Sequence, residues 1–184
     1  MSQNIERRTT QLVGLTSMLR GGFTLIEVML VVLILGIAAA VVVPMASSAG
    51  SLQIRAAANM VSADLEYAKS MAISRGQAYS VLFDKTNETY RILDHTGTVI
   101  THPVKKGFNY VIDFKNDGRL DRVNIDTVSF GSSSPNNKVT FDYLGSPYDN
   151  GGTSLSNPGV VTLRSGGAVR TVRVEPVTGF VSIN

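Results

Sequence analysis

The chain has 184 residues, of which 43% are hydrophobic, and this size suits one domain with one appended element. It contains no cysteine, which excludes a disulfide framework, a thiolate metal site, a cysteine nucleophile and a lipoprotein anchor. The net charge is +3, but residues 1–22 hold three arginines against one glutamate and supply most of it. This balance is a poor argument for nucleic-acid binding, and we expect no nucleic-acid partner.

The first predicted element is a transmembrane helix over residues 23–46. Within this segment only Thr24 and Glu27 are polar, and roughly 20 apolar residues cross a bilayer core. The arginines before it place the N-terminus in the cytoplasm and the larger C-terminal part on the outer side. Two simpler interpretations are a plain single-pass anchor and a secretory signal cleaved at the small residues 47–49.

The segment RGGFTLIE, residues 20–27, resembles the class III signal of type IV prepilins and pseudopilins. The resemblance implies that a prepilin peptidase removes the leader, residues 1–22, by cutting between Gly22 and Phe23. It also implies N-methylation of Phe23 by the same enzyme. In an assembled filament Glu27 would then face the free α-amine of a neighbouring subunit's Phe23. Independently of assembly, the Glu27 carboxylate would be stabilised by the positive end of the helix dipole. In the membrane it could lie near the lipid head groups.

A second, amphipathic half of the same helix is predicted over residues 47–76. Pro44 removes one backbone hydrogen bond and predicts a kink near the membrane exit. Beyond it, apolar residues recur at spacings of three and four and form a single stripe, whereas polar residues fall on another face. The helix is therefore predicted from about residue 24 to Arg75, with one stripe against a sheet. The stripe comprises Ile54, Ala58, Val61, Leu65, Ala68 and Ala72.

Residues 77–184 are predicted to form a β-rich globular head. Alternation in QAYSVLFD and ETYRILD indicates a hairpin, in which Tyr79, Val81 and Phe83 share one face. FNYVIDF and RVNIDTVSF flank a turn, and KVTFDYLG, GVVTLRSGG, VRTVRVEP and TGFVSIN complete an antiparallel set around a loop at 149–157. The predicted fold class is α+β, a long N-terminal helix packed on small antiparallel sheets in the manner of a pilin lollipop.

The order of the head segments resembles that of GspH/FimT-type minor pseudopilins, on ADLEYAKSMAISRGQ, VTFDYLGSP and TGFVSIN. The resemblance implies a non-catalytic subunit of a type II secretion pseudopilus, held in the bacterial inner membrane with its head in the periplasm. Its partners would be other pseudopilins or pilins and the prepilin peptidase. The alternatives are a minor type IV pilin for pilus assembly or DNA uptake, and a membrane-tethered periplasmic binding module or enzyme.

No cofactor, metal or catalytic site is predicted. The two histidines, His95 and His102, stand in turn-like contexts and cannot build an ordinary structural zinc site without cysteine. Residues 113–124 partly match a calcium loop, but Lys115 occupies a ligand position and Asn124 the place of a bidentate carboxylate, so a polar turn is favoured.

DNA binding of the FimT kind would use a C-terminal basic patch. The matching place, residues 179–182, reads GFVS and lacks arginine, and Arg170 and Arg173 are expected on opposite faces of a strand.

Overall fold

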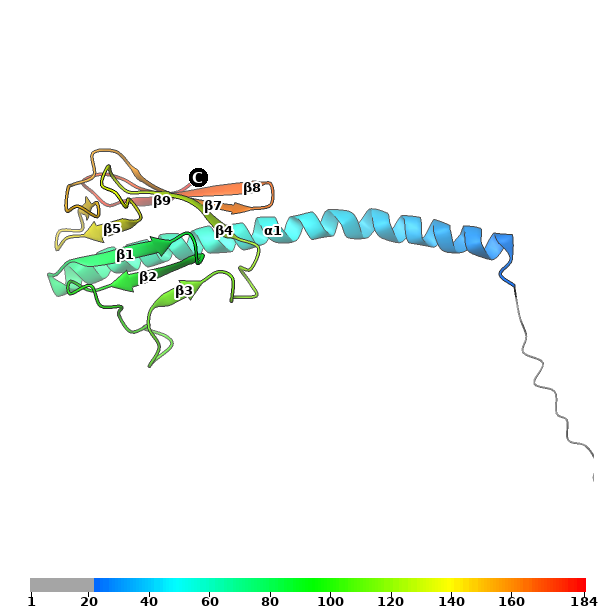
Figure 1. Ribbon diagram of the computed structural model, residues 1–184, viewed down its shortest axis with the longest axis horizontal. Helices are drawn as coiled ribbons and strands as arrows, with labels where there is room; N and C mark the ends of the chain where they lie inside the picture. Colours follow the sequence, from blue (N-terminus) through cyan, green and yellow to red (C-terminus); the bar gives the residue numbers. More distant parts are fainter. Residues whose placement is uncertain (1–21) are drawn as a thin grey trace, which may run out of the picture. The chain divides into compact units, whose positions relative to one another are not determined.

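The computed structural model describes residues 22–184, and within them it describes all side chains except those of residues 41–49. The chain divides into two compact units, with the boundary between Val41 and Val42. One helix, α1 (Leu25–Arg75), contributes to both units (Figure 1). The predicted long helix is therefore confirmed, with its start and end within one residue of the expected positions.

In the first unit, α1 is solvent-exposed at every residue from Leu25 to Ala40. Among the residues that the structure describes, no helix combines the length and apolar character that crossing a membrane requires. The predicted transmembrane segment 23–46 includes residues 41–46, whose side chains lie outside the described ones, and it stays a prediction. The helix continues through Pro44, and the kink predicted there also stays a prediction.

The head contains two antiparallel sheets. The five-stranded sheet has the order β3-β2-β1-β5-β6, and the four-stranded sheet has the order β4-β7-β8-β9. The predicted hairpin is confirmed, because β1 pairs with β2 in a register that places Phe83 opposite Tyr90. The strand bounds are β1 Tyr79–Asp84, β2 Thr89–Leu93, β3 Val111–Asp113, β4 Asn124–Ser129, β5 Lys138–Phe141, β6 Pro147–Tyr148, β7 Gly159–Ser165, β8 Ala168–Val174 and β9 Val181–Ile183.

The turn around residues 114–123 joins the two sheets. The strands on either side of it do not pair with each other: β3 pairs with β2, and β4 pairs with β7. The chain then returns through β5, which pairs with β1. The short strand β6 was not expected from the sequence; it pairs with β5 and starts at Pro147.

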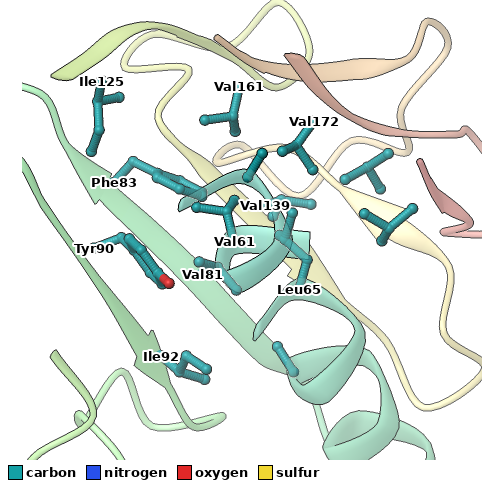
Figure 2. Packing of buried hydrophobic residues seen from close by; sticks show 14 of the residues in the cluster. Val61, Leu65, Val81, Phe83, Tyr90, Ile92, Ile125, Val139, Val161 and Val172 are labelled. Carbon is teal, nitrogen blue, oxygen red and sulfur yellow. The ribbon is translucent and has the colours of Figure 1, made fainter. Parts of the chain in front are cut away.

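The predicted helix stripe forms one wall of the core. All six of its residues are 2% exposed or less, and they belong to one buried cluster with residues of both sheets. Figure 2 shows Val61 and Leu65 of α1 among Val81, Val139 and Val172 of the strands. The alanines of the stripe let the sheets approach the helix closely. Burial of this stripe within the chain excludes its use as a coiled-coil seam.

One carboxyl group lies within this apolar wall. Asp64 of α1 is 8% exposed, and it accepts hydrogen bonds from the hydroxyls of Tyr90 (2.6 Å) and Tyr110 (2.7 Å). Burial raises the pKa of Asp64, and the two tyrosine hydrogen bonds oppose that rise only in part. Burial and the neighbouring Asp64 raise the pKa of both tyrosines. Because a buried polar group costs free energy unless it is bonded, these contacts fix α1 against β2 and the segment before β3.

Replacing Gly159 by alanine is expected to overpack the core. An added Cβ would press on the ring of Phe130, 2.7 Å from Cε1, and Phe130 is fully buried. The free energy of unfolding should fall by about 1–3 kcal/mol, measured by urea unfolding of the detergent-solubilised chain. The matched control is Gly167→Ala, whose new Cβ would meet nothing within 4 Å. Equal stability of the two variants would contradict the packing described here.

Replacing Asp64 by asparagine tests the ionisation of the buried cluster. Because the folded state binds the proton of Asp64 more tightly than the unfolded chain, its protonation stabilises the fold fully below the ordinary pKa of 3.8. That contribution is lost as the pH rises through the raised pKa. The stability of the wild type minus that of D64N should therefore fall with rising pH through this window and then level off. Urea unfolding across the acidic range measures it, and a difference that grows with pH would overturn the assignment.

Candidate functional site

The N-terminus of α1 is built by a cap at Thr24. The Glu27 N–H donates to Thr24 Oγ1 at 3.3 Å, and the Val28 N–H donates to the Thr24 carbonyl at 3.2 Å. Thr24 is therefore the N-cap residue, and Glu27 stands at the third helical position, where capping-box sequences carry Glu or Gln. This cap was not predicted from the sequence, although the residues T-L-I-E at positions 24–27 match the pattern. As the acidic residue of the first turn, Glu27 also favours the positive end of the helix dipole, in addition to the role that the prepilin resemblance implies.

Gly22 and Phe23 precede this cap. Both residues lie outside the helix, Phe23 is 79% exposed, and nothing lies within 4 Å of the place where a Gly22 Cβ would stand. A peptidase must reach an irregular, accessible peptide bond, and the bond between Gly22 and Phe23 meets that condition. The leader that would be removed lies, up to residue 21, outside the described residues.

The first turns of α1 combine one acidic group with a wholly apolar surface. Glu27 is exposed, and among residues 22–184 no ion pair is made by its carboxylate. Around and beyond it, the large exposed hydrophobic residues include Phe23, Leu25, Ile26, Val28, Met29, Leu30, Val31, Val32, Leu33, Ile34, Leu35 and Ile37. A contiguous apolar surface of this kind marks a site for lipid or for another protein. If a partner covered this surface, the Glu27 carboxylate would lose its water and would need a cation as its new partner.

Two carboxylates of the turn at 113–124 are satisfied within it, and a third, Asp121, accepts a hydrogen bond from Gln53 of α1 at 3.1 Å. Asp113 accepts two hydrogen bonds from Asn116, and Arg119 lies 2.7 Å from Asp117. The hydrogen bonds from Arg119 lower the pKa of Asp117 to about 2. In the part of the chain that the structure describes, no group of three or more His, Cys, Asp or Glu residues could hold a metal ion. These contacts favour the polar-turn interpretation over a calcium loop.

Two arginines near the C-terminus have acidic partners, whereas Arg170 Nη1 donates to the backbone carbonyl of Val169 at 3.3 Å. Arg164 lies 2.8 Å from Asp126, and this contact raises the pKa of Arg164 and lowers that of Asp126. Arg173 lies 3.7 Å from Glu175. Because these pairs neutralise part of the positive charge, the strands β7 and β8 offer a weak surface for phosphate groups.

The two histidines have different surroundings. His95 is exposed in a turn, whereas the ring of His102 stacks on that of Tyr110 with centroids 4.4 Å apart. His102 Nδ1 accepts hydrogen bonds from the backbone N–H groups of Val104 (3.1 Å) and Lys105 (3.2 Å). These contacts give His102 a structural role in shaping the loop that follows it.

Comparisons with known proteins extend these observations. A family model described as type II transport protein GspH matches residues 57–178, and a model of the prokaryotic N-terminal methylation motif matches residues 17–43. A search of curated proteins found no match.

Solved structures with similar folds include two minor subunits. The minor pseudopilin EpsH of the Vibrio cholerae type 2 secretion system is 13% identical, with a TM-score of 0.48, over 72% of this chain and 96% of that chain. The type IV minor pilin FimU of Pseudomonas aeruginosa is 20% identical, with a TM-score of 0.45, over 71% of this chain and 87% of that chain.

The GspH model spans more than half of the chain, from the amphipathic half of α1 to the turn before β9. The methylation motif covers Gly22, Phe23 and Glu27. Both matches agree with the resemblance that the N-terminal signal and the order of the head segments indicated. The chain therefore belongs to the GspH family of type II transport proteins, within the type IV pilin and pseudopilin superfamily.

Proposed function

We propose that this protein is a minor pseudopilin of a type II secretion system, a non-catalytic subunit of the periplasmic pseudopilus. The observation that carries the proposal is the joining of two matched segments by one helix. The methylation motif at 17–43 and the GspH segment at 57–178 share α1, which runs from Leu25 to Arg75. One continuous helix thus begins within the segment that carries the assembly signal and ends within the segment that matches the secretion family.

The proposed processing site is the bond between Gly22 and Phe23. Its exposure and its position outside the helix support access by a prepilin peptidase. Cleavage there removes residues 1–22 and leaves Phe23 as the new N-terminus, which is then methylated. Thr24 still caps α1 after this cut, because its oxygen atoms belong to the mature chain.

The exposed apolar residues of α1 support two successive environments for this helix. Before assembly they anchor the single-pass protein in the bacterial inner membrane, with the head in the periplasm. After assembly they pack against the same helices of other pseudopilins. In that dry setting Glu27 pairs with the α-amine of a neighbour's Phe23. Removing one partner of such a pair leaves a buried charge and costs roughly 3–5 kcal/mol.

The mature N-terminus is the first test of this proposal. Mass spectrometry of the protein from its host membrane should find a chain that begins at methylated Phe23. A chain that begins at Gly50 would identify residues 1–49 as a secretory signal. An uncut chain would identify a plain anchor. Either result would contradict the pseudopilin assignment. A deletion strain then separates the two filament types: if Phe23 is methylated but the strain secretes normally and loses its pili, the protein is a minor type IV pilin instead.

Glu27→Gln separates the charge of Glu27 from its place in the cap. Glutamine serves a capping box as well as glutamate does, so the variant should be processed normally but fail to join the filament, because the neighbour's amine lacks an anionic partner. Shearing the filaments and blotting for the subunit measures incorporation.

The matched control is Thr24→Val, which removes the capping hydroxyl and retains the carboxylate. Loss of the cap costs about 1 kcal/mol, and incorporation of this variant should persist. If Thr24→Val were excluded from filaments while Glu27→Gln entered them, helix capping rather than charge pairing would explain the site.

A further inference from the structure

Between β2 and β3 the chain forms a long loop that extends away from the sheet (Figure 1). Its two arms are joined by backbone hydrogen bonds from Tyr110 to Ile100 (2.7 Å) and from His102 to Phe108 (2.8 Å). We call residues 103–108 the tip loop. Every residue of the tip loop is exposed.

The tip loop stands on an ordered base. His102 Nδ1 accepts the N–H groups of Val104 and Lys105, and the His102 ring stacks on Tyr110. The Tyr110 hydroxyl in turn donates to the buried Asp64 of α1. A continuous set of contacts therefore runs from the core of the head to the tip, and it orders the backbone from which the exposed side chains project. Binding by a pre-organised loop avoids much of the entropy cost of ordering.

The tip loop presents apolar and cationic side chains together. Val104 is 83% exposed and Phe108 is 68% exposed, and the exposed Lys105 and Lys106 lie between them in sequence. From residue 95 to residue 112 the chain contains no aspartate or glutamate. Asp117 pairs with Arg119 at 2.7 Å, and the charge of Lys105 adds a smaller contribution to the lowered pKa of this carboxyl. Within residues 22–184 neither Lys105 nor Lys106 forms a direct ion pair, so their charge can attract an anionic partner.

We propose that the tip loop is a docking site for an anionic lipid surface. Lysines attract anionic head groups, and exposed Val and Phe side chains can enter the head-group boundary. A loop of six residues offers by itself little of the roughly 1,000 Å² that a stable protein interface buries, whereas a bilayer accommodates a small apolar wedge. This site is additional to the proposed pseudopilin function, and it concerns the subunit before it is assembled.

The experiment uses the full chain in vesicles. Because the chain has no cysteine, Val104→Cys and Leu144→Cys each allow one fluorescent label, at the tip loop and at the exposed turn between β5 and β6. Each labelled protein is reconstituted in phosphatidylcholine alone or mixed with phosphatidylglycerol, and a lipid-borne quencher reports contact with the bilayer. The label at 104 should be quenched in the anionic vesicles and recover with added salt. The label at 144 should respond equally in both lipids.

Charge removal provides the specific test. Each lysine near an anionic surface favours binding by a factor of roughly five, so Lys105→Gln with Lys106→Gln should weaken docking about thirtyfold. Both side chains are exposed, and an unchanged urea midpoint of the variant confirms that its fold is intact. Equal quenching at 104 in neutral and anionic vesicles, or no effect of the double substitution, would overturn the proposal.

A protein partner is a distinguishable outcome. If the label at 104 is shielded only when a second purified pseudopilin is added, and not by lipid, the tip loop is a protein contact and the lipid proposal is wrong. The vesicle measurement involves unassembled protein, so a failure of the pseudopilin assignment would leave it unchanged. Conversely, loss of lipid docking would leave cleavage at Phe23 and incorporation through Glu27 as they are.

Discussion

Burial of one face of α1 is the constraint on which the head depends. Neither sheet closes a core by itself: the five-stranded and four-stranded sheets each contribute buried residues to the cluster that the helix stripe completes. The strands β3 and β4 diverge into separate sheets, so few backbone hydrogen bonds hold the halves together across the turn between them. The apolar contact with Val61 and Leu65 supplies that connection (Figure 2).

The same helix has a contrasting chemistry at its other end. From Leu25 to Ala40 it exposes an apolar surface, interrupted by the carboxylate of Glu27 close to the N-terminal cap. A plain anchor has no need of that group, whereas an assembling helix can use it once a neighbour provides an amine. The proposed function therefore follows from two surfaces of one element, of which one is satisfied within the chain and the other requires partners.

The polar contacts of the head organise its irregular parts. Asp64 joins α1 to Tyr90 and Tyr110, and Tyr110 carries the stacked His102 at the base of the tip loop. Burying polar groups costs little free energy when all their hydrogen-bond partners are present, and much more when one partner is missing. A loop attached in this way holds Val104 and Phe108 in solvent.

The sequence by itself determined the local features. Periodicity located α1, its buried stripe and the β1–β2 hairpin, because these depend on residues that are neighbours along the chain. The segment that resembles a prepilin processing signal could be recognised for the same reason, because its residues are contiguous. The helix cap formed by Thr24 was not predicted. Only the tertiary structure decided that β3 and β4 part into different sheets, that Pro147 begins a strand, and that Asp64 meets two tyrosines. These contacts join residues up to 46 positions apart, and their selection depends on the packing of the whole head, which no local pattern encodes.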